Sequence, residues 1–340
     1  MSRPSILLLF GGESSEHDVS VMSASNVYAA MDDRKYDVHL CYIDRAGKWW
    51  FLESWPTNLQ LHGGVQLAPV PGSSAFLTVP GNRPIHIDVL FPVLHGENGH
   101  EDGAVQGLAN LTHIPAVGSG LGASAVCWDK LYTKQLLAQN DIPVVPYHVY
   151  HVGDEMPEYE ALASRLGEQL FVKPTVAGSS IGVSKVHRKD ELIPAIEKAS
   201  KHSSVVLIEQ AITGRELEVA VLGNPPTHRE SGVGEIIPGE EFYSYEDKYA
   251  TDSKAQVVTK ADIPDELRRE IQQIAHKSYA LLGCRGLARV DFFADESGVY
   301  LNEFNTLPGF TNISQYPKLW QAEGISYASL IDTIIQLALE

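Results

Sequence analysis

Residues 288–305 constrain the fold and the chemistry of this chain more than any other segment. Two apolar stretches within them flank a short polar turn, which predicts a β-hairpin. Side chains alternate between the two faces of a strand, so Arg289 and Asp291 share one face of the first strand. Glu303 and Asn305 share one face of the second strand for the same reason. If the strands pair, one face of the hairpin presents two carboxylates, a carboxamide and a guanidinium.

These side chains are typical of a site for phosphate chemistry. Oxygen ligands suit Mg²⁺, which proteins usually hold through one or two carboxylates together with substrate phosphates, and a guanidinium binds phosphate oxygens well. A surface hairpin with solvated charges would explain any one of the four residues. It explains the set less well, because apolar residues are interleaved with them and predict that the other face is packed. The interleaved residues are Val290, Phe292, Leu301 and Phe304.

Composition limits the classes of protein to which the chain can belong. Its 340 residues are 44% hydrophobic, enough for two or three domains with buried cores. The net charge of −17 argues against nucleic acid and anionic membranes as partners. We find no apolar stretch that could span a bilayer and no secretory signal, and expect a cytoplasmic protein. Cys41, Cys127 and Cys284 lack CxxC spacing, which argues against a disulfide framework or a zinc site.

The first 125 residues alternate short apolar strands with helical segments. This rhythm predicts an α/β domain, residues 1–125, built on a doubly wound parallel sheet. Residues 61–84 are rich in Gly, Pro and Ser and show no sustained periodicity, so we interpret them as a loop or a peripheral hairpin. The segments that set the rhythm are strands at 5–10, 36–43 and 89–92 and helices at 20–31 and 104–111.

Two further units are predicted, residues 126–228 and residues 229–340. A helix from about residue 123 to residue 139 leads into the first of them, and Ile142 and Pro143 terminate it. The last unit contains the hairpin. Additional strands are predicted at 170–174, 183–186, 205–209 and 216–222, and additional helices at 189–200, 265–282 and 327–339.

Two segments of the middle unit offer groups for a nucleotide. Residues 171–183 run from a strand that ends near Lys173 into a loop of small residues, whose backbone N–H groups can approach phosphate oxygens. A hairpin turn without a ligand explains this loop equally well, and its spacing is not that of a Walker A loop. Residues 205–216 predict a buried strand with a polar edge that could recognise adenine, although strands ending in acidic residues are common.

Three other features give weaker signals. The glycines of residues 118–122 lack the spacing and context of a dinucleotide fingerprint, and we assign them to turn geometry. Residues 97–103 lack EF-hand spacing and are interpreted as a loop. His95 follows an apolar strand, where a structural histidine and a substrate contact are equally consistent with the sequence.

Taken together, seven segments resemble the D-alanine–D-alanine ligases of the ATP-grasp superfamily, in the same order and over essentially the whole chain. Each segment alone is modestly specific, and the ordered set is very specific. The resemblance implies two ATP-grasp subdomains of α+β character after the first domain, with a mobile loop at about 235–260. The matching segments are 10–20, 94–103, 128–130, 173–180, 245–249, 286–291 and 302–314.

The resemblance also implies which residues bind nucleotide and metal. The residues implied for ATP are Lys130, Lys173 and Glu216, with Glu209, Gln210, Ala211 and Ile212 along the adenine edge. The residues implied for two Mg²⁺ ions, for which Mn²⁺ could substitute, are Asp291, Glu303 and Asn305.

The same resemblance implies the amino-acid subsites. Glu16 would bind the ammonium of a first D-alanine and Ser314 the carboxylate of a second, with His95 among the substrate-binding residues. Arg289 and the backbone N–H of Gly309 would form an oxyanion site.

A lid is implied as well. Glu16, Ser179 and Tyr249 would form a hydrogen-bonded triad that fastens the mobile loop over the reactants. Lys248, on that loop, would reach the transferred phosphate.

The activity implied is ATP-dependent ligation of two D-alanines through a D-alanyl phosphate, for peptidoglycan precursor synthesis, by a homodimer. One alternative is an ATP-grasp ligase for another amino or hydroxy acid, although Tyr249 favours an amine as the nucleophile. A second alternative is a nucleotide-binding regulatory module without turnover. The complete set of reactive groups on the hairpin disfavours it, because binding alone needs no oxyanion group.

Overall fold

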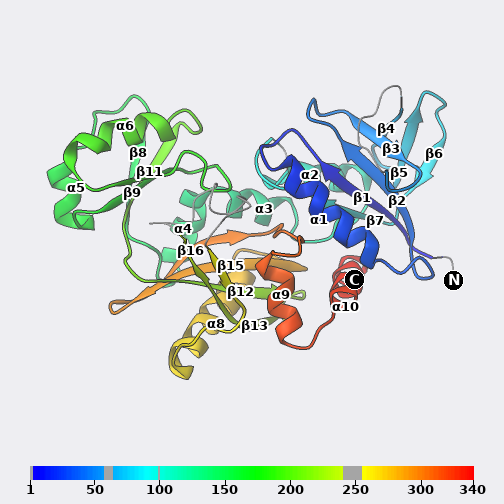
Figure 1. Ribbon diagram of the computed structural model, residues 1–340. Helices are drawn as coiled ribbons and strands as arrows, with labels where there is room; N and C mark the ends of the chain where they lie inside the picture. Colours follow the sequence, from blue (N-terminus) through cyan, green and yellow to red (C-terminus); the bar gives the residue numbers. More distant parts are fainter. Residues whose placement is uncertain (1–2, 57–63, 99, 240–254) are drawn as a thin grey trace.

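The computed structural model describes residues 3–56, 64–98, 100–239 and 255–340, and its described strands form three sheets (Figure 1). The first sheet lies in the N-terminal part, in blue and cyan. The second sheet lies in the green lobe on the opposite side of the view, and the third lies below and between them. The mixed α/β fold class expected from the sequence is confirmed, with a parallel segment in the first sheet and antiparallel second and third sheets.

The first sheet has the strand order β6-β5-β4-β3-β2-β1-β7. β1 is parallel to both β2 and β7, whereas β3 to β6 continue the sheet as an antiparallel meander. The meander includes the segment that we interpreted from the sequence as a loop or a peripheral hairpin. Its strands were not recognised individually, because strands this short, interrupted by Gly and Pro, carry too little periodicity. The strands are β1 (Ser5–Gly11), β2 (Asp37–Ile43), β3 (Trp49–Leu52), β4 (Val65–Val70), β5 (Ala75–Val79), β6 (Pro84–His86) and β7 (Val89–Val93).

Both faces of the first sheet are packed. Alternate residues of β1 point to opposite sides: Ile6, Leu8 and Phe10 join one cluster, and Leu7 and Leu9 join another. The first cluster contains residues of α1 (His17–Ala30) and α10 (Tyr327–Leu339), and the second contains residues of α2 (Ala104–Thr112). Because β1 is buried on both faces, nearly all of its residues must be apolar.

The second sheet is antiparallel, with the order β10-β9-β11-β8. Its apolar face packs on α5 (Tyr159–Leu166) and α6 (Lys189–Ala199), and the opposite face carries Lys173 and Glu209. The strands are β8 (Tyr147–His151), β9 (Leu170–Pro174), β10 (Ser184–Val186) and β11 (Val205–Gln210). β8 and α5 had not been predicted.

The third sheet is antiparallel, with the order β14-β13-β12-β15-β16. One face packs on α8 (Asp265–Leu281), and the other carries the polar side chains of the predicted hairpin and, further along, packs on α9 (Gln315–Ala322). The strands are β12 (Arg215–Leu222), β13 (Arg229–Ile237), β14 (Gln256–Val258), β15 (Leu287–Asp295) and β16 (Gly298–Asn305). β13, β14 and α9 had not been predicted.

The helix predicted at 123–139 is instead two helices, α3 (Leu121–Trp128) and α4 (Lys130–Ala138). Asp129 lies between them in an extended conformation, and its side chain accepts hydrogen bonds from the N–H groups of Leu131 and Tyr132. An aspartate that caps a new helix interrupts the preceding one, which apolar periodicity does not reveal. Among the described residues, no helix is both long and apolar enough to cross a membrane.

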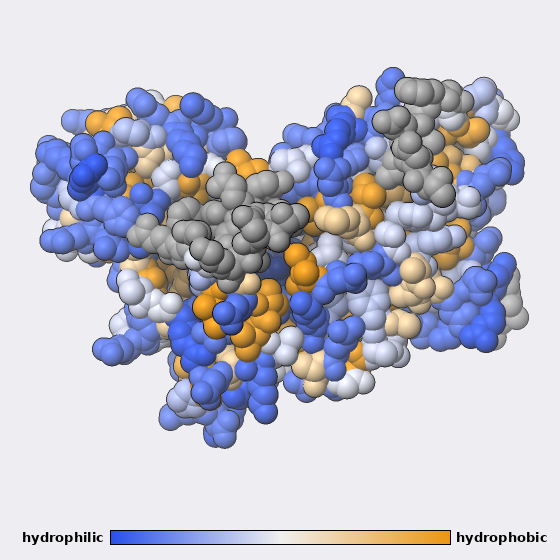
Figure 2. Space-filling view, viewed as in Figure 1, coloured by the Kyte–Doolittle hydropathy of each residue, from blue (hydrophilic) through white to orange (hydrophobic). Residues whose placement is uncertain are grey.

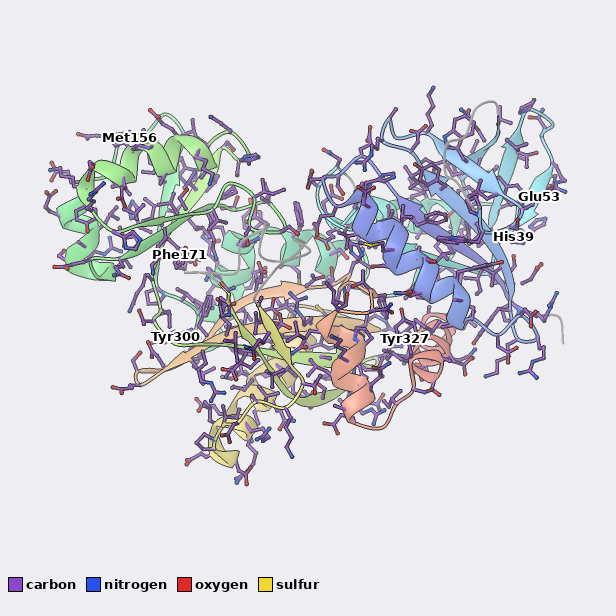
Figure 3. All side chains as sticks on the ribbon, viewed as in Figure 1. His39, Glu53, Met156, Phe171, Tyr300 and Tyr327 are labelled. Carbon is purple, nitrogen blue, oxygen red and sulfur yellow. The ribbon has the colours of Figure 1, made fainter. Side chains whose placement is uncertain are left out.

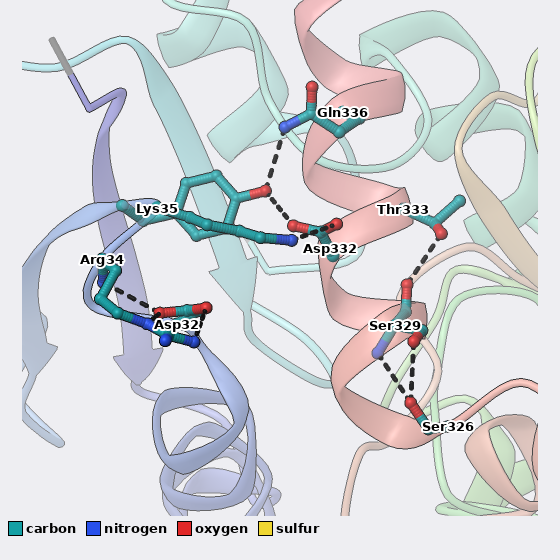
Figure 4. A network of polar contacts seen from close by, with 9 residues as sticks. Asp32, Arg34, Lys35, Ser326, Ser329, Asp332, Thr333 and Gln336 are labelled. Carbon is teal, nitrogen blue, oxygen red and sulfur yellow. Dashed lines mark hydrogen bonds and ion pairs between the residues drawn. The ribbon is translucent and has the colours of Figure 1, made fainter.

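The last helix of the chain, α10, docks against the first sheet (Figure 1). Leu330, Ile331, Ile334 and Ile335 are all buried there. Polar contacts fix the helix at its edge: Asp332 accepts a hydrogen bond from Lys35 at 3.0 Å and another from Tyr36 at 2.5 Å (Figure 4).

Gln336 also donates a hydrogen bond to the Tyr36 hydroxyl, at 3.0 Å. Burial, and then the hydrogen bond with Asp332, raises the pKa of Tyr36 to about 12, so the phenol stays protonated and can donate to this carboxylate. The C-terminal helix α10 is therefore held against the N-terminal part of the chain by both apolar packing and hydrogen bonds.

Replacing Ile334 by alanine should destabilise the protein by about 2–5 kcal/mol, because it leaves a cavity between α10 and the first sheet. The matched control is Leu339→Ala on the same helix, where the side chain is 40% exposed and the expected change is about 0.5 kcal/mol or less. Urea unfolding followed by circular dichroism measures both. Equal effects of the two substitutions would contradict the docking of α10.

Candidate functional site

A cleft of about 600 Å³ lies where the three sheets meet. It is lined by residues of the β1–α1 connection, of β9 and the loop after it, of β11 and β12, and of the β15–β16 hairpin. Figure 3 labels Phe171 on the lobe that carries β9, and Tyr300 on the sheet below it. Mostly hydrophilic side chains cover the outer surface of both upper lobes in the space-filling view (Figure 2).

The hairpin presents its polar residues to the cleft as a single face. β15 pairs with β16 so that Arg289 is opposite Asn305 and Asp291 is opposite Glu303. The register shifts after Asp291, which leaves Asn302 as an extra residue on β16. This bulge places Asn302 in the cleft lining beside Glu303.

Arg289 is held in place by two carboxylates. Its Nε and one terminal nitrogen donate to both oxygens of Asp291 at 2.7 and 2.6 Å, and Nε also lies 3.2 Å from an oxygen of Glu218. Burial alone would lower the pKa of Arg289, but the charges of Asp291 and Glu218 outweigh it and raise that pKa well above its ordinary value. The guanidinium is therefore a fixed positive charge whose position is set before any ligand arrives.

A second charged cluster lies between β9, β11 and α4. Glu209 is 3.0 Å from the Nζ of Lys134 and 2.8 Å from that of Lys173, and Lys173 donates to the amide oxygen of Asn302 at 3.2 Å. Burial lowers the pKa of Lys134 to about 8, against the opposing effect of Glu209. Burial would raise the pKa of Glu209, but the two lysines outweigh it and lower that pKa. Near neutral pH Lys134 and Glu209 therefore stay charged, and the carboxylate of Glu209 fixes the ammonium group of Lys173.

Lys130 connects α4 to the small-residue loop that follows β9. Its Nζ donates to the carbonyl of Ala177 at 2.8 Å and lies 3.4 Å from Glu303. Within the loop, Ser179 and Ser180 have φ angles of +48° and +59°. Consecutive non-glycine residues in this region are strained, and such strain persists where surrounding contacts fix it.

One of those contacts is a hydrogen bond from Ser179 to a carboxylate oxygen of Glu16, at 2.5 Å. Side chains at residues 96 and 178 would crowd this carboxylate, because a Cβ atom at Gly96 or Gly178 would lie 3.0 or 3.1 Å from its other oxygen. Glu101 lines the same part of the cleft. Burial, reinforced by the charge of Glu16, raises the pKa of Glu101 well above its ordinary value.

His95 is buried and connects the first sheet to the loop after β16. Its Nδ1 bonds to the carbonyl of Leu307 at 3.0 Å, so Nδ1 carries the proton, and Nε2 can accept from the hydroxyl of Ser23 at 3.4 Å. Ser23 in turn accepts a hydrogen bond from the N–H of Phe310 at 3.1 Å. Burial lowers the pKa of His95, which favours this neutral form. His95 therefore positions the backbone of the loop after β16, and it also lines the cleft.

Gly309 and Ser314 lie on the loop that His95 and Ser23 hold. A Cβ atom on Gly309 would be 2.8 Å from the Ser314 hydroxyl, so a side chain at residue 309 would displace Ser314. Ser314 is the N-cap of α9, and its hydroxyl oxygen accepts from the N–H of Thr311 at 3.0 Å. The positive end of the α9 dipole therefore faces this edge of the cleft.

The structure brings most of the predicted site residues into the cleft lining. Ala211 is absent from the lining, and its backbone N–H donates to the carbonyl of Gln169. Lys248 and Tyr249, with most of the loop predicted to be mobile, lie outside the described residues. The predicted residues that line the cleft are Glu16, His95, Lys130, Lys173, Ser179, Glu209, Gln210, Ile212, Glu216, Arg289, Asp291, Glu303, Asn305, Gly309 and Ser314.

Several participants were not identified from the sequence. Lys134 is four residues after Lys130 in the predicted helix, and this spacing places the two on neighbouring positions of one helix face. Asn302 enters the cleft through the bulge. Glu101 belongs to a matching segment but carried no predicted role, and Glu218 follows Glu216 at strand spacing on the same face of β12.

The donor set on the hairpin fits a hard divalent cation. Asp291 and Glu303 supply carboxylate oxygens and Asn305 an amide oxygen, on adjacent paired strands. These are the ligands that Mg²⁺ and Mn²⁺ accept. The amide oxygen of Asn305 also accepts the N–H of Leu307, which orients that side chain.

Comparison with known proteins gives consistent results over the whole chain. Residues 5–119 match the family described as D-ala D-ala ligase N-terminus, and residues 136–336 match the D-ala D-ala ligase C-terminus. The chain is 45% identical to D-alanine–D-alanine ligase A of Chromobacterium violaceum, covering 100% of this chain and 96% of that protein.

Two solved structures are similar as well. One is the D-alanine-D-alanine ligase of Coxiella burnetii, with a TM-score of 0.88, 35% identity and coverage of 100% of this chain and 94% of that one. The other is a D-Ala:D-Ser ligase of Enterococcus faecalis, with a TM-score of 0.89, 35% identity and coverage of 99% and 100%.

Replacing Lys134 by methionine should destabilise the protein by about 3 kcal/mol, because it removes one of the two buried cations that compensate Glu209. Adding Glu209→Gln should recover part of that loss, so the two effects will not add. Chemical unfolding of the two single variants and the double variant measures the coupling. The exposed Lys201→Met serves as the control, and additive effects would contradict the buried cluster.

Proposed function

The chain belongs to the D-alanine–D-alanine ligase family, and from this membership we propose that it joins two D-alanine molecules into D-alanyl-D-alanine with ATP as phosphoryl donor. A dipeptide of this kind is a precursor for peptidoglycan. The single observation that most supports turnover is the paired face of β15 and β16, which carries Arg289 beside Asp291, Glu303 and Asn305 in the cleft.

The proposed chemistry has two steps. A carboxylate is a poor acyl donor to an amine, so its oxygen first attacks the γ-phosphorus of ATP, giving D-alanyl phosphate and ADP. The amine of the second D-alanine then attacks the acyl carbon, a proton is lost, and the C–O bond to phosphate breaks. The products are the dipeptide, ADP and inorganic phosphate.

At the nucleotide end, Lys130 and Lys173 would bind the phosphates, and the end of β11 with Glu216 would bind adenosine. Support comes from their positions in the cleft and from Glu209, which holds the Lys173 ammonium at 2.8 Å. Because Ala211 donates its N–H to Gln169, the adenine contact would rest on the neighbouring residues. Preformed charges of this kind stabilise the phosphoryl group during transfer without reorganising.

Asp291, Glu303 and Asn305 would hold two Mg²⁺ ions, with Mn²⁺ as a substitute. Bound there, the ions would offset the charge that develops on the transferring phosphoryl oxygens. Arg289 would supply a further positive charge at the edge of the same face, where Asp291 and Glu218 hold its guanidinium.

At the amino-acid end, Glu16 would bind the ammonium of the first D-alanine. Ser314, at the N-terminus of α9, would bind the carboxylate of the second, because a helix N-terminus favours an anion. Arg289 and the N–H of Gly309 would stabilise the tetrahedral oxyanion. His95 would support this site by holding the carbonyl of Leu307 in the loop that leads to Gly309.

Residues 235–260 would form a lid that excludes water from the acyl phosphate, with Lys248 reaching the phosphate and Tyr249 completing a triad with Ser179 and Glu16. The Ser179–Glu16 hydrogen bond supports this assignment. We also propose a cytoplasmic homodimer. Light scattering that gives a single species near the 37.3 kDa of one chain would contradict the dimer.

The activity itself is tested by incubating the purified protein with ATP, Mg²⁺ and D-alanine and measuring ADP, phosphate and dipeptide. Equimolar formation of all three supports the proposal. D-serine and D-lactate supplied together with D-alanine test other acceptors, and a dominant mixed product would identify a different ligase. Nucleotide binding without any product would identify the regulatory alternative.

Replacing Glu303 by glutamine should lower turnover about 100-fold, because the lost charge acts mainly on the transition state. Nucleotide affinity should change much less. Steady-state ADP formation at saturating substrates, beside fluorescence titration with a nucleotide analogue, separates the two quantities. Near-normal turnover would remove Glu303 from the metal site.

Replacing Ser179 by alanine should lower kcat/KM for D-alanine about 10-fold, because it removes one hydrogen bond to the charged Glu16. Nucleotide affinity should stay the same, since the lost contact is at the amino-acid end. Ser184→Ala, on the strand after the same loop, is the matched control. If both variants behave alike, the Ser179 hydroxyl has no part in the site.

A further inference from the structure

Three residues with metal-binding side chains meet on the side of the third sheet that faces away from the cleft. His228 immediately precedes β13, Glu230 is on β13, and His276 is on α8. One ligand atom from each lies within 4.8 Å of the others. Glu230 is paired with Val221, whose side chain packs on the α8 face, so the cluster and the cleft lie on opposite faces of the sheet.

The tautomer of His228 follows from its hydrogen bond. Its Nε2 bonds to the carbonyl oxygen of His276 at 3.1 Å, and because a carbonyl only accepts, Nε2 carries the proton. The neutral ring then has its lone pair on Nδ1. Histidine ligands of metals usually donate their other N–H to a carbonyl or carboxylate in this way, which fixes the ring and its tautomer.

The Nδ1 atom of His228 is the observation that points to a ligand. His228 is only 6% exposed, and its Nδ1 is buried without a hydrogen-bond partner in the part of the chain that the structure describes. A buried acceptor without a partner is unfavourable, and few occur in folded proteins. A bound cation would satisfy this lone pair.

The other two groups already interact. The Nδ1 of His276 lies 2.7 Å from a carboxylate oxygen of Glu230, within hydrogen-bonding distance, and a cation could take the place of the hydrogen between them. The rings of His228 and His276 are stacked, with centroids 4.0 Å apart and an angle of 17° between their planes. Lone pairs in nearly parallel rings do not converge, so the ring of His276 must tilt for both to bind one ion. Its side chain is 49% exposed and has room to do so.

From this geometry we infer that His228, Glu230 and His276 form a binding site for a divalent transition-metal ion, with water completing its coordination. Two imidazoles and one carboxylate are a ligand set that proteins use for zinc, at distances of about 2.0–2.2 Å, and nitrogen ligands disfavour Mg²⁺. The site contains no cysteine and is independent of the ligase chemistry. A bound ion would connect α8 to the start of β13.

The test uses the full-length protein without a histidine tag, stripped of metal with a chelator and titrated with ZnSO₄ in excess Mg²⁺. The Mg²⁺ occupies oxygen sites in the cleft, so Zn²⁺ binding measured by calorimetry reports on nitrogen-containing sites. We expect one equivalent of Zn²⁺ to bind and the thermal unfolding midpoint to rise with its concentration. Glu230→Gln and His276→Ala should each weaken binding about 10-fold or more.

His86→Ala is the matched control, because His86 is exposed on β6, far along the chain from the cluster, and should leave the binding unchanged. Circular dichroism and ligase turnover without Zn²⁺ verify that each variant is folded. Anomalous scattering at the zinc edge from Zn²⁺-soaked crystals locates the ion. The inference fails if no equivalent binds, if Glu230→Gln and His276→Ala both bind Zn²⁺ like the parent, or if the ion lies elsewhere.

Discussion

The ion pair between Arg289 and Asp291 is the interaction on which the arrangement of the cleft depends. Two hydrogen bonds, at 2.7 and 2.6 Å, fix the guanidinium of Arg289, whose side chain is only 18% exposed, on the polar face of the hairpin. The same pattern recurs around it, since Glu209 fixes Lys173 and Lys130 lies 3.4 Å from Glu303. Charges removed from water must be compensated. Ligands therefore enter a site whose charged side chains are already held in place by partners.

The cleft also depends on contacts that connect distant parts of the chain. His95 and Ser23, both from the first sheet and its helix, hold the backbone of Leu307 and Phe310 on the other side. Gly309 lies between these two anchored residues, so the position of its N–H is set by the first sheet. Burial of α10 against that sheet joins the same parts a second time. The geometry proposed for the oxyanion site is therefore a property of the whole chain rather than of one loop.

Much of this could be predicted from the sequence, because strand alternation and ordered motifs are local. Period-two alternation predicts that Arg289 and Asp291 share one face of their strand and that Glu303 and Asn305 share one face of theirs, and the structure pairs these two faces. Leu301 and Phe304 both pack in the core. They are three residues apart, and in a regular strand residues an odd number apart point to opposite faces. That mismatch was the available signal for the bulge and for Asn302. The contacts of Lys134 and Ser23 join segments far apart in sequence, and no local pattern reveals such contacts.

The charge balance of the cleft gives an independent reason for a cation at the hairpin. Among the described residues that line it, eight are acidic and five are lysine or arginine, so the acidic side chains are in excess. The raised pKa of Glu101 removes one negative charge without reversing that excess. A nucleotide triphosphate adds several more negative charges to the same volume, where low polarity strengthens repulsion. Side chains alone do not offset that charge, whereas divalent ions on Asp291, Glu303 and Asn305 would do so at the place where phosphate must approach. Divalent ions held by the hairpin, as proposed above, would therefore make its acidic face compatible with an anionic substrate.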